Sequence, residues 1–139
     1  MAVVVDASVL LVSVSGDPRQ AAARALIRSW IDSGEDLHAP ALLPYEVANG
    51  LARLVAARAF PSARVGETWR ALMSLPIAYH ELPDHGERAV AIALKLGRRS
   101  AYDAAYLALA EQLGADLWTF DGPLVRNATA LGFSVRLAG

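Results

Sequence analysis

Residues 100–121 read SAYDAAYLALAEQLGADLWTFD, a helix followed at once by a strand. Ser100 and Asp103 have the spacing of a capping box, which predicts the helix start, and Gly114 predicts its left-handed end. The apolar residues of this helix recur at intervals of three and four: Tyr106, Leu109, Ala110 and Leu113. The strand Leu117–Phe120 comes next, and a helix that leads directly into a strand is the repeating unit of an α/β fold.

The rest of the chain alternates between strands and helices in the same way. The β-branched run Ala2–Val5 predicts a strand that is buried on both faces and stops at Asp6. Two further strands are predicted at Leu37–Ala39 and Phe133–Leu137, while Ile77–Leu82 fits either a strand or an extended segment. Helices are predicted at Pro18–Ser33, from Pro44 onward, at Pro61–Leu75, at Gly86–Leu96 and at Pro123–Leu131. This alternation predicts an α/β sandwich with a mainly parallel sheet.

Length and composition indicate one soluble domain. A chain of 139 residues suits a single core, and 55% hydrophobic against 19% charged residues excludes a disordered protein. The opening segment lacks a basic leading region, and Asp6 interrupts its apolar run, so we interpret it as a buried strand and not as a secretion signal. No stretch approaches the roughly 20 apolar residues of a membrane span. The chain has no cysteine, which fits a reducing compartment, and we expect the cytoplasm.

The net charge of the chain is −1, although proteins that bind RNA usually carry an excess of basic residues. Twelve of its thirteen basic residues are arginines, which form bidentate contacts with phosphates and carboxylates. If the chain binds RNA, its charges must therefore be unevenly distributed.

Four acidic residues occupy positions where α/β proteins bind ligands. Asp6 and Asp121 each follow a predicted strand, while Glu46 and Asp103 lie in the first turns of helices. The crevice of an open α/β sheet lies beyond the carboxyl ends of its strands. Carboxylates gathered there repel one another unless a cation or a proton intervenes, and oxygen ligands favour a hard divalent ion. The sequence therefore predicts a magnesium-type site.

Three segments together resemble the PIN-domain family, and within it the VapC-like toxins of bacterial toxin–antitoxin pairs. They are VVVDASVLL at 3–11, PYEVANGL at 44–51 and the long segment at 100–121. The resemblance extends over nearly the whole chain. It implies a Rossmann-like, three-layer α/β/α sandwich and a Mg²⁺- or Mn²⁺-dependent endoribonuclease. It also implies a homodimer and a cognate antitoxin that inserts a peptide into the active site.

The same resemblance assigns roles to individual residues. The acidic positions of the family match Asp6, Glu46, Asp103 and Asp121 as catalytic residues. Asp6, Asp103 and Asp121 are the implied metal ligands, and Glu46 is either a ligand or the group that positions the attacking water. The small hydroxyl positions beside the metal match Ser8 and Thr119, which would orient the carboxylates.

Each acid also has a purely structural interpretation. Asp103 could complete the capping box of Ser100, Asp6 and Asp121 could cap the segments that follow them, and Glu46 could favour the positive end of its helix. The ordered set of four in one short chain favours the metal site.

Other polar residues are weaker candidates. Asn49 lies one turn after Glu46 and is a candidate for orienting a ligand or for binding substrate. Arg98 and Arg99 are candidates either for contact with RNA phosphates or for a pair of solvated loop residues. Asp116 precedes Asp121 by five positions, about 16 Å along a strand, and is not expected to bind the metal. The histidines show no helical pairing, so no role is assigned to them: His38, His80 and His85.

Two rival functions remain. A phosphatase that forms a phosphoaspartate would also place an acid after a strand, but Ser8 stands where its second acid is expected. A PIN-like module that binds RNA or protein without cleavage is the other, and the complete set of four acids argues against it.

Overall fold

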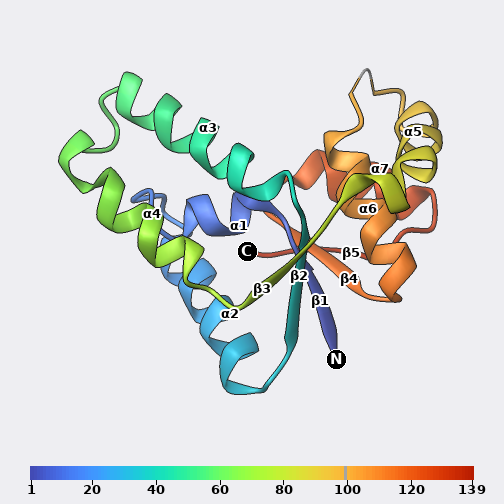
Figure 1. The fold of residues 1–139 in the computed structure, drawn as a ribbon, viewed down its shortest axis with the longest axis horizontal. Helices are drawn as coiled ribbons and strands as arrows, with labels where there is room; N and C mark the ends of the chain where they lie inside the picture. Colours follow the sequence, from blue (N-terminus) through green and yellow to red (C-terminus); the bar gives the residue numbers. More distant parts are fainter. Residues whose placement is uncertain (99) are drawn as a thin grey trace.

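The structure of the chain is a computed structural model that describes residues 1–98 and 100–139. Within these residues the centre is a five-stranded sheet in which every paired strand runs parallel, in the order β3-β2-β1-β4-β5 (Figure 1). The strands are β1 (Ala2–Val5), β2 (Asp36–Pro40), β3 (Ile77–His80), β4 (Asp116–Thr119) and β5 (Val135–Leu137). The predicted parallel sheet is confirmed, and Ile77 does begin a strand.

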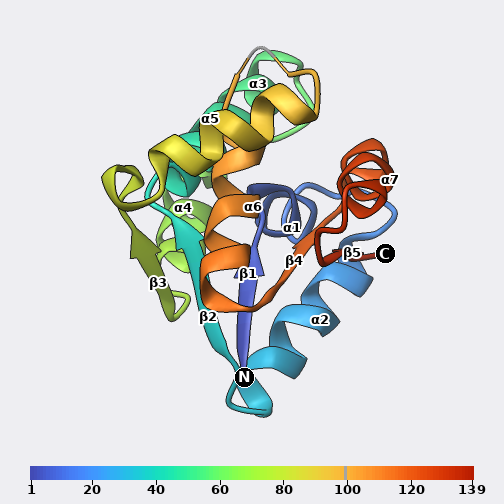
Figure 2. The same cartoon turned by 90° about the vertical axis from the view of Figure 1, so that its right-hand side faces the viewer.

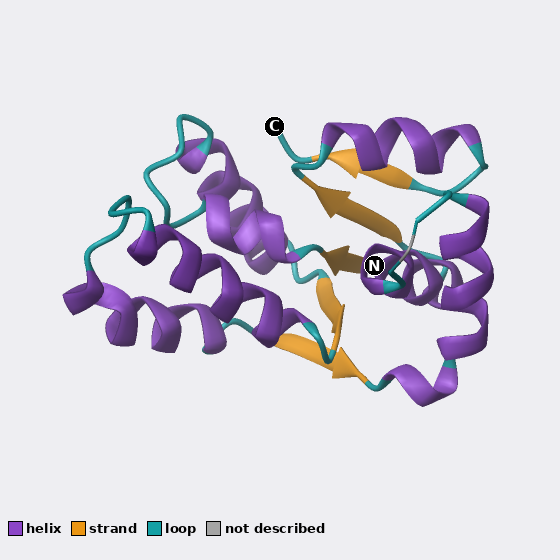
Figure 3. Cartoon of the chain, turned by 90° about the horizontal axis from the view of Figure 1, so that it is seen from above, coloured by secondary structure: helices purple, strands orange, loops and turns teal. Residues whose placement is uncertain are grey.

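Helices cover both faces of the sheet, which gives the three layers of an α/β/α sandwich (Figures 1 and 3). One face carries α1 (Ala7–Val12), α2 (Gln20–Asp32), α3 (Leu43–Ala56) and α4 (Val65–Met73). The other carries α5 (Gly86–Lys95), α6 (Tyr102–Leu113) and α7 (Gly122–Ala130). Short 3₁₀ turns at Ser62–Arg64 and Leu82–Asp84 precede α4 and α5. Among the described helices, none is both long and apolar enough to cross a membrane.

Strand β1 lies at the middle of the sheet, where the direction of the chain reverses. From β1 the chain moves outward to β2 and β3, then returns over the opposite face to β4 on the other side of β1. At such a switch point the flanking loops separate and leave a crevice beyond the carboxyl ends of the strands. Asp6 follows β1 directly, and its backbone N–H continues the ladder by donating to the Trp118 carbonyl at 3.0 Å.

Helix α6 lies over the centre of the sheet, beneath α5 (Figure 2). All seven residues from 104 to 110 are at most 4% exposed, so the helix is buried around its whole circumference. The predicted apolar stripe on one side was therefore too narrow, because α5 covers the outer side as well. The left-handed conformation of Gly114, at φ 62°, confirms the predicted helix end.

Two local predictions differ from the structure. Helix α1 was not predicted, because six residues in a continuous apolar run do not show helical periodicity clearly. The capping box of Ser100 and Asp103 was wrong: the N-cap of α6 is Ala101, and no side chain caps that end. Since Asp103 is then only the second residue of α6, it lies too close to the helix start to be the third-position partner of a cap.

Candidate active site

The Asp6 carboxylate is held by two hydroxyl groups at the end of β1. Its Oδ2 accepts hydrogen bonds from Ser8 Oγ at 2.5 Å and from Thr119 Oγ1 at 2.9 Å. The same oxygen also accepts from the Ser8 backbone N–H at 3.3 Å. Each hydroxyl also accepts a backbone hydrogen bond of 3.0 Å, Ser8 from Phe120 and Thr119 from Asp121. Because each hydroxyl accepts from the backbone, its proton is directed at the carboxylate.

In this arrangement only one carboxylate oxygen of Asp6, Oδ2, accepts hydrogen bonds from described residues. In the described part of the chain no donor contacts Oδ1, which leaves that oxygen available to a ligand. Burial raises the pKa of the Asp6 carboxyl, the hydrogen bonds from Ser8 and Thr119 oppose that rise, and the charge of Asp121 adds to it. A half-buried carboxylate that keeps one free oxygen is suited to hold a cation.

Glu46 lies in the first turn of α3, which begins with Leu43 and Pro44 after β2. Its Oε1 accepts a hydrogen bond of 2.6 Å from the hydroxyl of Tyr106, a residue of α6 that is 1% exposed. Burial raises the pKa of the Glu46 carboxyl, and the negative charges of Asp6 and Asp103 add to the rise. The pKa of Tyr106 is also raised, first by burial, so its hydroxyl stays a donor.

Asp103 and Asp121 complete the acidic group. Burial raises the pKa of Asp103, with Asp6 as the next cause, and the nearby Arg98 opposes the rise. The Arg98 guanidinium lies 3.9 Å from the Asp103 carboxylate. Asp121 is the N-cap of α7, where its Oδ1 accepts from the Leu124 backbone N–H at 3.0 Å.

The four acids lie at the carboxyl edge of the sheet, where the carboxyl ends of the parallel strands meet. Their negative charges shift one another's pKa values. Asp6 acts on the pKa of Glu46 and of Asp103, and Asp121 acts on that of Asp6. All four are half-buried, so each side chain keeps a surface toward solvent. Among the residues that the structure describes, no three acids or histidines approach closely enough to enclose an ion. The donor set fits a hard divalent cation, whose positive charge would offset the repulsion between the carboxylates.

The prediction that Asp6 and Asp121 cap the segments that follow them is also confirmed, because each is the N-cap of the next helix. A cap uses one carboxylate oxygen, so capping and metal binding do not exclude each other. Asp116 lies at the amino end of β4, opposite Val3, and its carboxylate bonds to Arg136 at 2.5 Å. It stands away from the acidic group, as expected from its position on the strand.

The remaining predicted residues lie around this edge. Asn49 is exposed on α3, one turn beyond Glu46, and Arg98 lies beside Asp103. Arg99 falls outside the described residues. The histidines include one pair that their spacing in the sequence did not indicate: His38 Nδ1 lies 2.9 Å from His80 Nε2 across β2 and β3.

Tyr106 is the site residue that the sequence did not reveal. It was assigned to the apolar stripe of its helix, although its position three residues after Asp103 places both on one helix face. A buried tyrosine needs a partner for its hydroxyl, and that requirement was the available signal.

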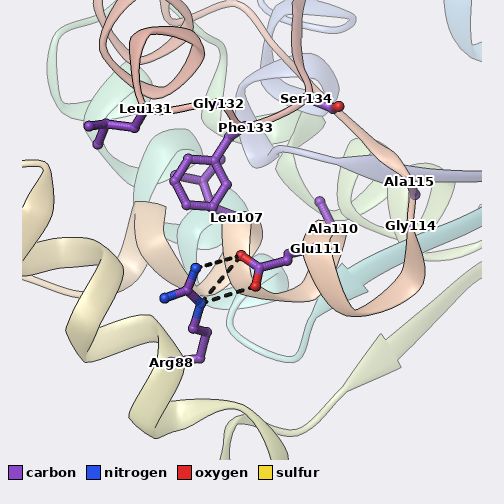
Figure 4. A pocket seen from close by; sticks show the side chains of 10 residues that line it. All are labelled: Arg88, Leu107, Ala110, Glu111, Gly114, Ala115, Leu131, Gly132, Phe133 and Ser134. Atoms are coloured by element: carbon purple, nitrogen blue, oxygen red, sulfur yellow. Dashed lines mark hydrogen bonds and ion pairs between the residues drawn. The ribbon is translucent and has the colours of Figure 1, made fainter.

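A second cleft of about 390 Å³ lies at the opposite edge of the sheet (Figure 4). It is formed by α5, α6 and the segments that precede β4 and β5, and the Arg88 guanidinium bonds there to Glu111 at 3.0 to 3.3 Å. None of the four acids of the carboxyl edge lines it.

Comparison with known proteins identifies the family. The family model of the PIN domain matches residues 3–129. The chain is 38% identical over 122 residues to "Ribonuclease VapC9" of Mycobacterium tuberculosis, which covers 86% of this chain and 85% of that protein. It is 33% identical over 135 residues to "Ribonuclease VapC3" of Pyrobaculum aerophilum, with 94% and 98% covered.

A solved structure has the same architecture. The crystal structure of PAE2754 from Pyrobaculum aerophilum superposes with a TM-score of 0.69 at 25% identity, covering 99% of this chain and 90% of that one. The sequence motifs and the parallel sheet thus agree with the comparisons, and the chain belongs to the PIN-domain family.

Proposed function

We propose that this chain is a Mg²⁺- or Mn²⁺-dependent endoribonuclease and the toxin of a toxin–antitoxin pair. The observation that carries the proposal is the Asp6 carboxylate, which two hydroxyls hold by one oxygen while three further acids surround its edge of the sheet. Relatives that cover most of the chain are named ribonucleases, which supports RNA as the substrate.

Asp6, Asp103 and Asp121 would hold the cation, directly or through water. Ser8 and Thr119 keep the Asp6 carboxylate in one orientation before the ion binds. Ion binding would therefore cost little further conformational entropy of the Asp6 side chain. A bound divalent ion would lower the pKa of a coordinated water and neutralise negative charge on the phosphoryl oxygens.

Glu46 would position the attacking water. Tyr106 holds its Oε1, which leaves Oε2 to accept a hydrogen bond from water, and the raised pKa of this carboxyl makes it a better proton acceptor than a free glutamate. In the hydrolysis, the water oxygen would form a new bond to phosphorus while one of its protons passes to the carboxylate. The bond from phosphorus to the leaving ribose oxygen would break, and that oxygen would keep the bonding pair and take up a proton from solvent. Arg98, beside Asp103, would contact an RNA phosphate, and Arg99 is proposed for the same role.

The toxin assignment rests on the resemblance of the sequence to VapC-like toxins and is supported by relatives that are named VapC ribonucleases. Under this assignment the chain would be cytoplasmic and would form a homodimer. An antitoxin would inhibit it by placing a peptide in the acidic site. Expression of the chain alone should slow growth, and co-expression of the neighbouring small gene should restore it. Normal growth at high soluble expression would count against a toxin.

The direct test is cleavage of RNA by the purified chain. We expect fragments with Mg²⁺ or Mn²⁺ and intact RNA in excess EDTA, because the four acids of this edge offer carboxylate oxygens, which favour hard divalent ions. Full cleavage in EDTA would refute metal dependence. Binding of RNA without cleavage under any metal condition would favour the non-catalytic binding module.

A further inference from the structure

Two tyrosines beside the acidic edge are exposed to an extent that folding does not explain. Tyr45 on α3 is 76% exposed and Tyr102 on α6 is 63% exposed. In the described part of the chain neither hydroxyl has a hydrogen-bond partner. By contrast, Tyr106 is buried and bonded to Glu46. Exposed aromatic rings contribute little to a core, and their place beside the acids makes these two candidates for contact with a bound molecule.

Each exposed ring stands next to a proposed active-site acid. Tyr45 directly precedes Glu46 in the first turn of α3, and Tyr102 directly precedes Asp103 at the start of α6. Their two helices approach the carboxyl edge from opposite faces of the sheet. The rings therefore flank the acidic group from both layers.

Between these helices the structure has a cleft of about 530 Å³. Its lining consists of Leu42, Tyr45, Glu46, Asn49, Arg53 and Tyr102. Glu46 belongs both to this cleft and to the acidic group, so whatever occupies the cleft continues into the site where a phosphodiester would be cut. The volume is large enough for one or two nucleotides and too small for a folded partner.

The groups that line this cleft match the parts of a nucleotide. The flat faces of Tyr45 and Tyr102 can stack on bases, the exposed Arg53 can bond to a phosphate, and the amide of Asn49 can bond to a base edge. Stacking on aromatic side chains is the usual way in which proteins hold unpaired bases, and it needs no particular base.

We propose that this tyrosine cleft binds the unpaired nucleotides of single-stranded RNA next to the scissile phosphate. The inference rests on the proposed ribonuclease function and adds to it the residues that would hold the substrate beside the cut, above all Tyr45 and Tyr102. Paired bases are covered on both faces by their neighbours, so a duplex offers these rings nothing to stack on.

A segment of a partner protein fits the tyrosine cleft less well than RNA does. A separate groove between α3 and α4 is lined only by apolar side chains, among them Val55 and Trp69, as a partner helix would require. The tyrosine cleft instead carries a cation, an amide and a carboxylate among its six lining residues.

The test is binding of a fluorescein-labelled single-stranded RNA of about 12 nucleotides to the full chain. Binding is followed by anisotropy in EDTA at low ionic strength, so that the RNA stays intact and electrostatic contacts are least screened. Tyr45→Ala and Tyr102→Ala should each raise Kd about tenfold, within the range found for the loss of one stacked base. Tyr45→Phe and Tyr102→Phe keep the ring and should bind as the wild type does.

Tyr79→Ala is the matched control, because Tyr79 is a 40% exposed tyrosine on β3 outside the cleft. It should leave Kd within twofold of wild type. A duplex of the same sequence should compete at least tenfold more weakly than the single strand. Melting curves of the Tyr45 and Tyr102 variants should match that of the wild type, since the two cleft tyrosines contribute little to the core.

The inference is overturned if both alanine variants bind the single strand within twofold of wild type, or if the duplex competes equally well. It is also overturned if the alanine variants weaken only the binding of an antitoxin peptide. In those cases cleavage of RNA by the wild type would still support the ribonuclease. Absence of metal-dependent cleavage by the wild type would instead remove the proposed function itself.

Discussion

Asp6→Asn separates the structural role of this residue from its proposed metal-binding role. The amide oxygen of asparagine can still accept hydrogen bonds from Ser8 and Thr119 and can still cap α1, because Asn and Asp cap helices about equally well. What the substitution removes is the negative charge. The expected effects on stability and on cleavage therefore have opposite signs.

Without metal the variant should be the more stable protein. Burial and the charge of Asp121 raise the pKa of the Asp6 carboxyl, which means that its ionised form destabilises the folded state at neutral pH. Removing that charge should increase the free energy of unfolding by on the order of 1 kcal/mol. For a chain of this length such a gain raises Tm by roughly 3 to 5 °C.

With Mg²⁺ the order should reverse. An ion present at about 100 times its Kd stabilises the folded wild type by roughly 2.7 kcal/mol, or about 8 to 13 °C in Tm. The variant lacks one proposed ligand and should gain less than half of this. Its RNA cleavage should fall by at least about 100-fold, since even outer-shell partners of metal ligands contribute 10- to 100-fold.

The assay is a pair of melting curves, in EDTA and in Mg²⁺, with RNA cleavage measured on the same preparation. Asp116→Asn is the matched control, because Asp116 is a half-buried aspartate at the other end of the sheet that bonds to Arg136. It should cleave within a few-fold of wild type and keep the full Mg²⁺ shift. Wild-type cleavage by Asp6→Asn, or an equal Mg²⁺ shift in both proteins, would refute the role of Asp6.

Further predictions concern the other acids and the cation. Tyr106→Phe removes the donor to Glu46 and should lower kcat about tenfold with little change in KM, as measured by steady-state cleavage; an unchanged kcat would contradict the positioning role. Mn²⁺ should restore cleavage to protein stripped with EDTA, whereas Zn²⁺ should restore less, and equal recovery with both would argue against an oxygen-only site. In EDTA, Tm should rise as the pH falls from about 7 toward 5. The pKa values of three site acids are raised in the folded state, which therefore takes up protons before the unfolded chain does. A Tm that falls steadily over this interval would show that other groups dominate.

The sequence was sufficient for the features that depend on local pattern. The run Ala2–Val5 predicted a buried strand, Gly114 predicted the end of α6, and the positions of Asp6 and Asp121 after strands predicted where they lie on the sheet. Parallel strands present their carboxyl ends at one edge, so the gathering of these acids followed from topology alone.

Features that depend on short elements or distant contacts were not predictable. Helix α1 has six residues, too few for a periodic pattern, and Ser100 matched a capping box although the helix begins later. The hydrogen bond from Tyr106 to Glu46 joins residues that are 60 positions apart, and it forms only because α3 and α6 meet at the sheet edge. The local sequence can indicate that Tyr106 needs a hydrogen-bond partner, but it does not indicate that the partner is Glu46.

The complete burial of α6 constrains how the protein can be controlled. Residues 104–110 are enclosed by the sheet on one side and α5 on the other, and close-packed protein interiors do not deform gradually. Enlarging one of its alanines would cost about 1 to 3 kcal/mol. The helix that carries Asp103 and Tyr106 is therefore a fixed support with no room to slide or rotate into an inactive arrangement. The proposed enzyme would need no rearrangement of this helix once it has folded and bound its metal ion, so restraint would have to come from outside, through a molecule that occupies the site or through the amount of protein made.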